Sequence, residues 1–138
     1  MTGEAVIDTS VLVDAIVEEA QKHMRAREQL AALTRMTIPS VVLYELVWVL
    51  NRLAVAPEKV LEAVETLVRN PKVAVSPDDG AISVRAIRRV VSEKTALSDF
   101  DDKVVLETAM KLGLPLVTYD KELEREMRRA ESEAGSRV

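Results

Sequence analysis

Short runs of apolar and β-branched residues alternate with longer stretches of helical periodicity along this chain of 138 residues. The short runs are typical of buried strands and cover Ala5 to Asp8, Met36 to Ile38, Val73 to Val75 and Leu116 to Thr118. A polar or turn residue and then a helical pattern follow each run. This alternation predicts an α/β fold with three layers, α/β/α, in which helices cover both faces of a parallel sheet.

The helical patterns fill the segments between these strands. They predict helices over Ser40 to about Leu53, Pro57 to about Val68, Gly80 to about Lys94 and Phe100 to Leu112, and an early helical stretch from about Val11 to Leu33 that is broken near Val17. We expect Ser40 to cap its helix, and Gly113 to end the helix before it in the left-handed conformation.

The end of the chain differs in composition from the rest. Residues 121–138 are a dense run of Lys, Glu and Arg with few apolar positions, which predicts a helix that frays into a tail. A chain of this length forms one domain. We therefore expect a globular domain over residues 1–120, followed by a charged helix and tail over residues 121–138.

The composition restricts the chemistry that is possible. Without cysteine there is no disulfide, thiol nucleophile or thiolate zinc site. The single histidine, His23, lies outside every motif and is expected to be a solvated surface residue. No apolar run approaches the ~20 residues of a membrane span, and the first residues lack the basic segment of a signal peptide. We therefore expect a cytoplasmic protein that does not bind membranes.

A net charge of −4 disfavours non-specific binding to polyanions, so nucleic-acid binding requires a local basic patch and bound metal. Arg85, Arg88 and Arg89 share one predicted helix face and could bind phosphates. A solvated helix face is the simpler interpretation, and the nucleic-acid-binding residues are therefore left unassigned.

Four acidic residues lie in apolar surroundings, where a charged carboxylate is costly. Asp8 and Asp120 each end a predicted strand, Glu45 interrupts the apolar run from Val41 to Trp48, and Asp102 begins an apolar helix. A buried carboxylate must be protonated, paired or bound to a cation, and few cationic residues are neighbours of these acids in sequence. Sites in open parallel sheets form at the carboxyl ends of strands. We therefore predict that the four acids converge on divalent metal.

Each acid also has a structural explanation that stays open. Asp8 and Asp120 could cap the helices that follow them. Glu45 could pair with an arginine from elsewhere in the chain, and the helix dipole could favour Asp102 at the start of its helix.

The order and spacing of these motifs resemble the PIN domain family, and within it the small VapC-type toxin ribonucleases. The resemblance covers nearly the whole chain and rests on three segments, from Val6 to Asp14, from Pro39 to Leu46 and from Asp102 to Asp120. It implies that residues 1–120 form a PIN-like nuclease domain.

The resemblance also implies roles for individual residues. The family's catalytic, metal-binding acids correspond to Asp8, Glu45, Asp102 and Asp120. Asp102 is preferred to Asp99 and Asp101 because its distance from Asp120 matches the family. Residues expected to lie beside the acids and support them are Thr9, Ser10 and Thr118. The last of these corresponds to the threonine that the family carries next to its final acid.

Two features depart from the family pattern. Lys103 follows the third acid, where a small residue is commoner, and no clear closing strand follows Asp120. We therefore expect a PIN-like fold with a parallel sheet of four or five strands.

The resemblance implies a hydrolase, an endoribonuclease that depends on Mg²⁺ or Mn²⁺, cleaves RNA, forms a homodimer and is held silent by an antitoxin protein. The helix from Ser40 is apolar on more sides than a sheet can cover, so Trp48, Leu50 and Leu53 are expected at the dimer interface unless the helix from Pro57 covers them. Alternatives are a ribosomal-RNA processing nuclease, a DNA-acting nuclease of the same fold, and a non-enzymatic interaction module whose acids cap helices.

Overall fold

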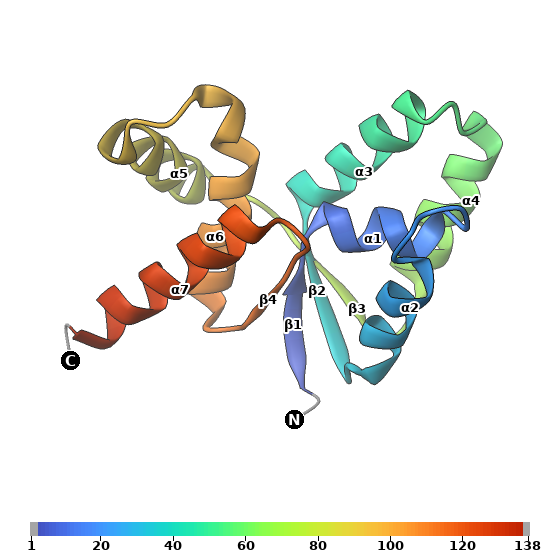
Figure 1. Cartoon of the computed structure of the whole chain (residues 1–138), viewed down its shortest axis with the longest axis horizontal. Helices are drawn as coiled ribbons and strands as arrows, with labels where there is room; N and C mark the ends of the chain where they lie inside the picture. The colour runs from blue at the N-terminus through green and yellow to red at the C-terminus, as the bar shows by residue number, and fades with distance from the viewer. Residues whose placement is uncertain (1–2, 137–138) are drawn as a thin grey trace.

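Runs of apolar residues form a parallel sheet at the centre of the molecule (Figure 1). The computed structural model describes residues 3–136. The strands are β1 (Glu4–Ile7), β2 (Arg35–Pro39), β3 (Val73–Ser76) and β4 (Leu116–Val117), in the order β3-β2-β1-β4. All neighbouring strands are parallel, which confirms the predicted sheet. Residues 3–136 contain no fifth strand, so the described sheet has four.

Seven α-helices of residues 3–136 cover both faces of this sheet. They are α1 (Thr9–Ile16), α2 (His23–Ala32), α3 (Ser40–Arg52), α4 (Pro57–Arg69), α5 (Gly80–Glu93), α6 (Phe100–Leu112) and α7 (Lys121–Ser136), with a short 3-10 helix, η1 (Leu97–Asp99), before α6. Helices α1 to α4 lie on one side of the sheet and α5 to α7 on the other (Figure 1). This arrangement is the predicted α/β/α fold, and the early helical stretch is interrupted after Ile16, close to the predicted break.

Two predicted helix ends had different outcomes. Gly113 has a φ of 64° and ends α6 in the left-handed conformation, as predicted. The prediction that Ser40 caps α3 is wrong, because Pro39 occupies the capping position. The Ser40 hydroxyl instead donates to the carbonyl of Ser76 (3.3 Å), and the amide of Val41 donates to the Asp78 carboxylate (2.8 Å).

The main core joins the sheet to helices from both layers. Val6 and Ile7 of β1 are fully buried and belong to one apolar cluster with residues of α1, α3 and α6. Helix α7 joins this cluster through Leu123, Met127 and Ala130, whose spacing of four and three residues places them on one helix face. The charged run from Lys121 therefore forms a helix that packs on the core, and the last two residues of the predicted tail lie outside the described part.

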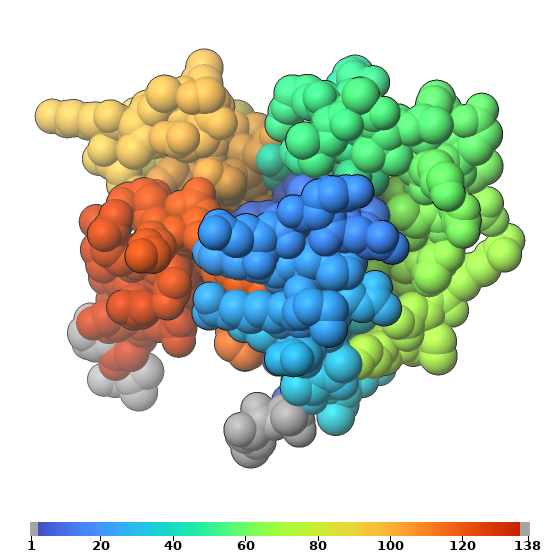
Figure 2. Space-filling view, turned by 45° about the vertical axis from the view of Figure 1, so that its right-hand side comes forward, coloured from blue at the N-terminus to red at the C-terminus, as the bar shows by residue number. Residues whose placement is uncertain are grey.

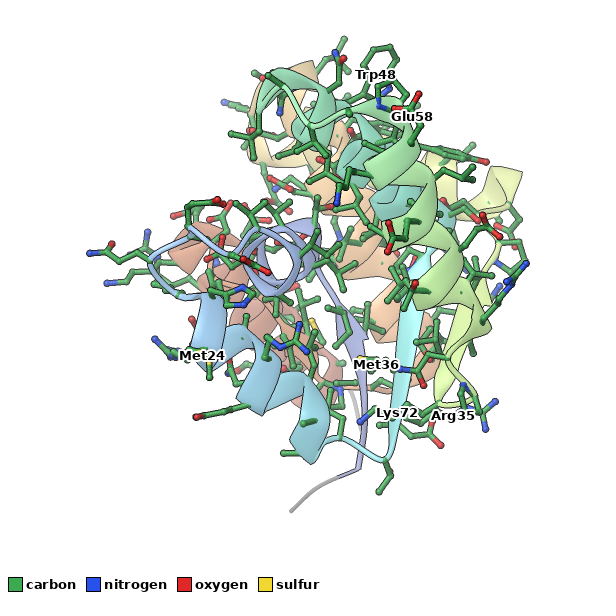
Figure 3. All side chains as sticks on the ribbon, turned by 90° about the vertical axis from the view of Figure 1, so that its right-hand side faces the viewer. Met24, Arg35, Met36, Trp48, Glu58 and Lys72 are labelled. Carbon is green, nitrogen blue, oxygen red and sulfur yellow. The ribbon has the colours of Figure 1, made fainter. Side chains whose placement is uncertain are left out.

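The amino ends of the strands are fixed by a lysine. The Nζ atom of Lys72, just before β3, donates to the carbonyls of Leu30 and Leu33 at the end of α2 (2.8 Å each), where helix carbonyls lack partners. Figure 3 shows Lys72 near Arg35 and Met36 at this end of the sheet. The acids predicted to form the site follow the opposite, carboxyl ends of β1 and β4.

The surface brings distant segments together. Helices α1 and α2 lie between α7 on one side and α3 and α4 on the other (Figure 2). Within residues 3–136, no helix combines the length and the apolar character that crossing a membrane requires.

Candidate active site

Asp8 lies at the carboxyl end of β1 and is 5% exposed. It occupies the capping position of α1, but its side chain forms no capping hydrogen bond. Its Oδ2 atom instead accepts hydrogen bonds from the hydroxyls of Ser10 (3.0 Å) and Thr118 (2.7 Å). Capping by the side chain therefore does not explain the acid at this position.

The three hydroxyl residues predicted to lie beside the acids connect the elements of the site. Thr9 donates to Glu45 Oε1 (3.2 Å), which joins α1 to α3. Ser10 accepts from the amide of Tyr119 (3.1 Å), and Thr118 accepts from the amide of Asp120 (3.0 Å). The Ser10 bond holds the start of α1 against the segment between β4 and α7, and the Thr118 bond orders the backbone within that segment.

Glu45 lies on α3 and accepts the hydrogen bond from Thr9, the residue after Asp8. None of the Lys, Arg or His side chains in residues 3–136 forms an ion pair with Glu45. Pairing with an arginine of the described chain therefore does not explain this acid. Burial, together with the negative charges of Asp101 and Asp8, raises the pKa of Glu45 to about 7.

Asp102 lies in the first turn of α6, and none of the residues 3–136 forms a hydrogen bond or ion pair with its side chain. Burial, followed by the charges of Asp8 and Asp120, raises the pKa of Asp102 to about 7. Asp99 also contributes to this pKa, whereas Asp101 acts mainly on Glu45. The neighbours that compete with Asp102 in sequence therefore have different electrostatic surroundings in the fold.

Asp120 has the structural role that the sequence left open. Its Oδ1 atom accepts from the amides of Glu122 (2.9 Å) and Leu123 (3.2 Å) and so caps α7. Its charge nevertheless acts on Asp102. Capping fixes the orientation of the Asp120 carboxylate without removing it from the acidic site.

The four acids line one open hollow of about 320 Å³ at the carboxyl edge of the sheet. The other residues that line it are Thr9, Ser10, Val13, Asp14, Val49 and Tyr119. Sequence reasoning missed Asp14, although its position four residues after Ser10 places both on one face of α1.

The donor set of this hollow suits a hard divalent cation, because it consists of carboxylate oxygens whose like charges repel one another. As the side chains stand, no three acids or histidines of residues 3–136 are close enough to hold one ion. Metal binding would therefore draw the carboxylates inward.

A larger groove of about 1020 Å³ lies between α5, α6 and α7. The acids Glu93, Glu107 and Glu126 line this groove and form ion pairs with Arg89 or Lys103. Because these carboxylates already have cationic partners, the smaller hollow is the better candidate for metal chemistry.

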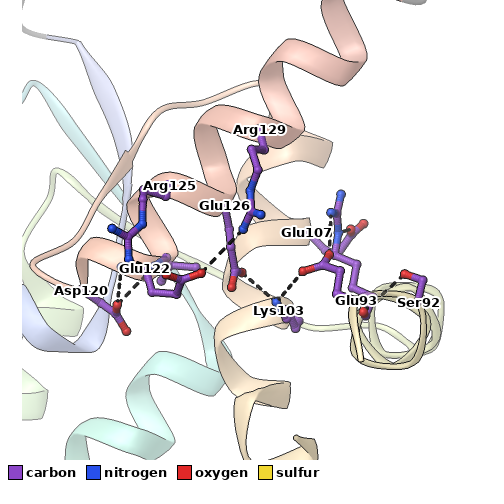
Figure 4. Close-up of polar contacts among 11 residues, drawn as sticks. Ser92, Glu93, Lys103, Glu107, Asp120, Glu122, Arg125, Glu126 and Arg129 are labelled. Atoms are coloured by element: carbon purple, nitrogen blue, oxygen red, sulfur yellow. Dashed lines mark hydrogen bonds and ion pairs between the residues drawn. The ribbon is translucent and has the colours of Figure 1, made fainter. Parts of the chain in front are cut away.

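Lys103, the residue that departs from the family pattern, lies behind the hollow. Its side chain is completely buried, and Nζ donates to Glu93 (2.9 Å) on α5 and Glu126 (2.8 Å) on α7 (Figure 4). Arg89 pairs with Glu107 in the same network. Lys103 therefore connects three helices, and Arg89 is engaged with acids rather than available for phosphates.

His23 differs from the prediction for it. The side chain is half-buried, and its Nδ1 donates to the carbonyl of Asp14 (2.8 Å), because a carbonyl oxygen only accepts. His23 is thus a contact between α2 and α1 rather than a solvated side chain.

Comparison with known proteins gives a family and several similar solved structures, two of which are described below. The family model described as PIN domain matches residues 5–126. No curated protein matches the chain. VapC20 of Mycobacterium tuberculosis, a toxin that cleaves the sarcin-ricin loop, is 18% identical and superposes with a TM-score of 0.79 over 88% of this chain and 94% of its own.

The second structure is VapBC2 from Rickettsia felis, bound to a DNA fragment from its promoter. It is 16% identical, with a TM-score of 0.61 over 88% of this chain and 92% of that one. At these identities the two likenesses establish the fold.

Proposed function

This chain belongs to the PIN domain family, and from that premise we propose that it is a metal-dependent endoribonuclease that hydrolyses RNA phosphodiester bonds as the toxin of a toxin–antitoxin pair. One observation carries the proposal. Four carboxylates from distant parts of the chain line one hollow, and none has a cationic partner within residues 3–136. Such an arrangement opposes folding unless a cation offsets the repulsion.

The residues that would hold Mg²⁺ or Mn²⁺ are Asp8, Glu45, Asp102 and Asp120. A bound metal of this kind supplies Lewis-acid stabilisation of phosphate charge and a more acidic water. Thr9, Ser10 and Thr118 would keep the carboxylates oriented through the hydrogen bonds that they already make.

The hollow also favours one set of product ends. The chain's only histidine is bonded to the Asp14 carbonyl and does not line the hollow. The RNA 2′-hydroxyl would therefore lack a histidine base, and water is the expected nucleophile. Hydrolysis by water leaves a 5′-phosphate and a 3′-hydroxyl.

The test is to incubate RNA with the purified protein and Mg²⁺ or Mn²⁺, and to map the new ends. RNA ligase should rejoin the fragments directly, and a chelator should stop cleavage. Full activity in the chelator would overturn the metal dependence. Fragments ending mainly in 2′,3′-cyclic phosphate would overturn attack by water.

A homodimer is proposed through the outer face of α3. Trp48 is 64% exposed and Leu53 is 52% exposed, so α4 does not cover this face. Figure 3 shows Trp48 at the outer edge of the molecule. The prediction that Leu50 contributes is wrong, because Leu50 is fully buried in the core. A monomer by light scattering at tens of micromolar would exclude this assembly.

The remaining parts of the proposal follow from the toxin assignment. We propose an antitoxin protein as partner, supported by the solved VapBC2 assembly, and a cytoplasmic location, where RNA substrates are found. All four acids lie within residues 1–120, which would form the nuclease domain, with residues 121–138 as its charged helix and tail. Action on DNA would use the same acids, and comparing cleavage of RNA and DNA substrates separates it. Ribosomal-RNA processing without an antitoxin would use them too, and the presence of an antitoxin gene beside the gene for this chain separates it.

A further inference from the structure

An RNA strand needs cations beside the acidic hollow. The chain carries a net charge of −4, and four carboxylates face the place where the phosphate would react. Proteins hold nucleic acid mainly through cationic contacts with backbone phosphates. Many of the cations are already engaged with acids, namely Arg69, Arg89, Lys103, Lys111, Arg125, Arg128 and Arg129. Lysines and arginines without such a pair that lie beside the hollow are therefore the candidates for phosphate binding.

Two cations lie over the ring of Tyr119. Tyr119 precedes Asp120 in the chain, and both residues line the hollow. The Nζ atom of Lys22 is 4.6 Å from the ring centroid, and the Cζ atom of Arg25 is 5.4 Å from it. Neither cation forms an ion pair with an acid of residues 3–136.

The ring that carries the cations is itself fixed. The Tyr119 hydroxyl donates to Gln29 on α2, and the Tyr119 amide donates to Ser10. The ring is thus held between the backbone that bears Asp120 and the helix that bears Arg25. The ring over which the two cations lie therefore keeps a fixed place relative to the acids.

A cation over an aromatic face keeps its hydrogen-bond donors. The ring attracts the positive charge but offers no lone pair, so the donors of the ammonium and guanidinium groups stay available for phosphate oxygens. Lys22 is half-buried and Arg25 is exposed, so a ligand can reach both.

We propose that Lys22 and Arg25, positioned by Tyr119, bind phosphates of the single-stranded RNA backbone beside the bond that is cleaved. The proposal rests on the nuclease function proposed above and adds the side chains that hold the substrate. It assigns binding to the start of α2 rather than to Arg85 and Arg88 on α5.

The test measures binding of a labelled single-stranded RNA by fluorescence anisotropy over a series of salt concentrations. An Asp8→Asn background prevents cleavage during the measurement. Adding Lys22→Ala with Arg25→Ala should weaken binding roughly tenfold and reduce the salt slope by about 0.7 for each lost phosphate contact. The matched control is Arg27→Ala with Arg35→Ala, which removes the same charge from exposed positions, neither of which lies over the Tyr119 ring.

Cleavage kinetics give a second readout. With native acids, the Lys22/Arg25 double variant should show a raised KM and an unchanged kcat, because both cations contact the strand beside the reacting phosphate. Lys22→Arg should retain near-native KM. Equal loss in the two double variants, or no loss in either, would overturn the proposal while wild-type cleavage remains. Failure of the wild type itself to cleave RNA would instead refute the nuclease function.

Discussion

Consecutive residues on α6 have opposite electrostatic surroundings. Asp102 points to a hollow in which burial, and then the charges of other acids, raise its pKa to about 7, and no cation of residues 3–136 pairs with it. Lys103 is fully buried between Glu93 and Glu126, with Nζ within 2.9 Å of both carboxylates. Asp102 thus lies among charges of the same sign, whereas Lys103 lies between charges of the opposite sign.

This contrast indicates that Lys103 stabilises the fold, whereas Asp102 serves function. Burial alone would lower the pKa of Lys103, but hydrogen bonds to Glu126 and Glu93 raise it, so the lysine stays charged and connects three helices. Removing Lys103 leaves Glu126 without an ion-pair partner among residues 3–136 and Glu93 with Arg89 alone, which is destabilising. Removing Asp102 relieves repulsion, so this acid is better explained by activity than by stability.

The largest expected effect is on activity, through Asp102→Asn. This change keeps the shape of the side chain but removes a charged oxygen ligand. Cleavage should fall by at least roughly 1000-fold, equivalent to about 4 kcal/mol of transition-state stabilisation. In metal-free buffer the variant should unfold at the same or a higher temperature than the wild type.

The measurements are an RNA cleavage assay and thermal unfolding followed by circular dichroism. A folded Asp102→Asn protein with native activity would remove Asp102 from the site. A lower unfolding temperature without metal would contradict the repulsion inferred for the hollow.

The next effect is on stability, through Lys103→Met on the opposite side of α6. Methionine keeps much of the length of lysine but leaves Glu93 and Glu126 without their shared cation. Since Glu93 is partly exposed, we expect the lower end of the range for a broken buried pair, about 3 kcal/mol of lost unfolding free energy.

The control for Lys103→Met is Arg128→Met, which breaks the exposed pair of Arg128 with Glu124. Such a pair contributes about 0.5 kcal/mol or less. Urea unfolding of both variants checks the comparison, and equal losses would mean that Lys103 contributes no more than a surface residue.

A smaller effect concerns pH. Burial first, and then neighbouring acids, raise the pKa of Glu45 from 4.5 and of Asp102 from 3.8, in each case to about 7. A carboxyl with a raised pKa binds more protons in the folded than in the unfolded state over this interval. The contribution of this carboxyl to the free energy of unfolding is fully present below about pH 4 and is lost as the pH rises through about 7.

Metal-free protein should therefore lose stability between about pH 4 and pH 7, and saturating Mg²⁺ should remove much of this loss. Other groups also titrate in this range, so the quantity to compare is the difference from a Glu45→Gln/Asp102→Asn variant in urea unfolding. An identical pH profile for the two proteins would exclude raised pKa values for Glu45 and Asp102.

Sequence predicted the fold well where local pattern decides it. The strands are short β-branched runs, and Gly113 ends α6 because glycine adopts a positive φ without strain. The buried face of α3 was harder, because only the placement of the sheet shows that Leu50 faces the core while Trp48 faces solvent.

The four acids could be found because each lies in an apolar motif, two of them at strand ends. The rest of the site depends on contacts between distant elements. Lys22 and Arg25 meet Tyr119 only because α2 packs beside the segment before α7. The partners of Lys103 likewise come from α5 and α7. The sequence therefore showed that Lys103 departs from the family pattern, but not that it pairs with acids of two other helices.

The smallest expected effect separates Asp99 and Asp101, the two acids that precede Asp102 in the sequence. Asp101 is the charge that contributes most to the raised pKa of Glu45, whereas Asp99 acts on Asp102. Asp101→Asn should therefore lower the pKa of Glu45, and Asp99→Asn should lower that of Asp102 instead. Solvent screens these partly exposed groups, so we expect changes in unfolding free energy of only a few tenths of a kcal/mol. Carboxyl titration by NMR in metal-free buffer resolves the two residues separately. If both substitutions moved the pKa of the same carboxyl, Asp99 and Asp101 would not act on different acids of the hollow.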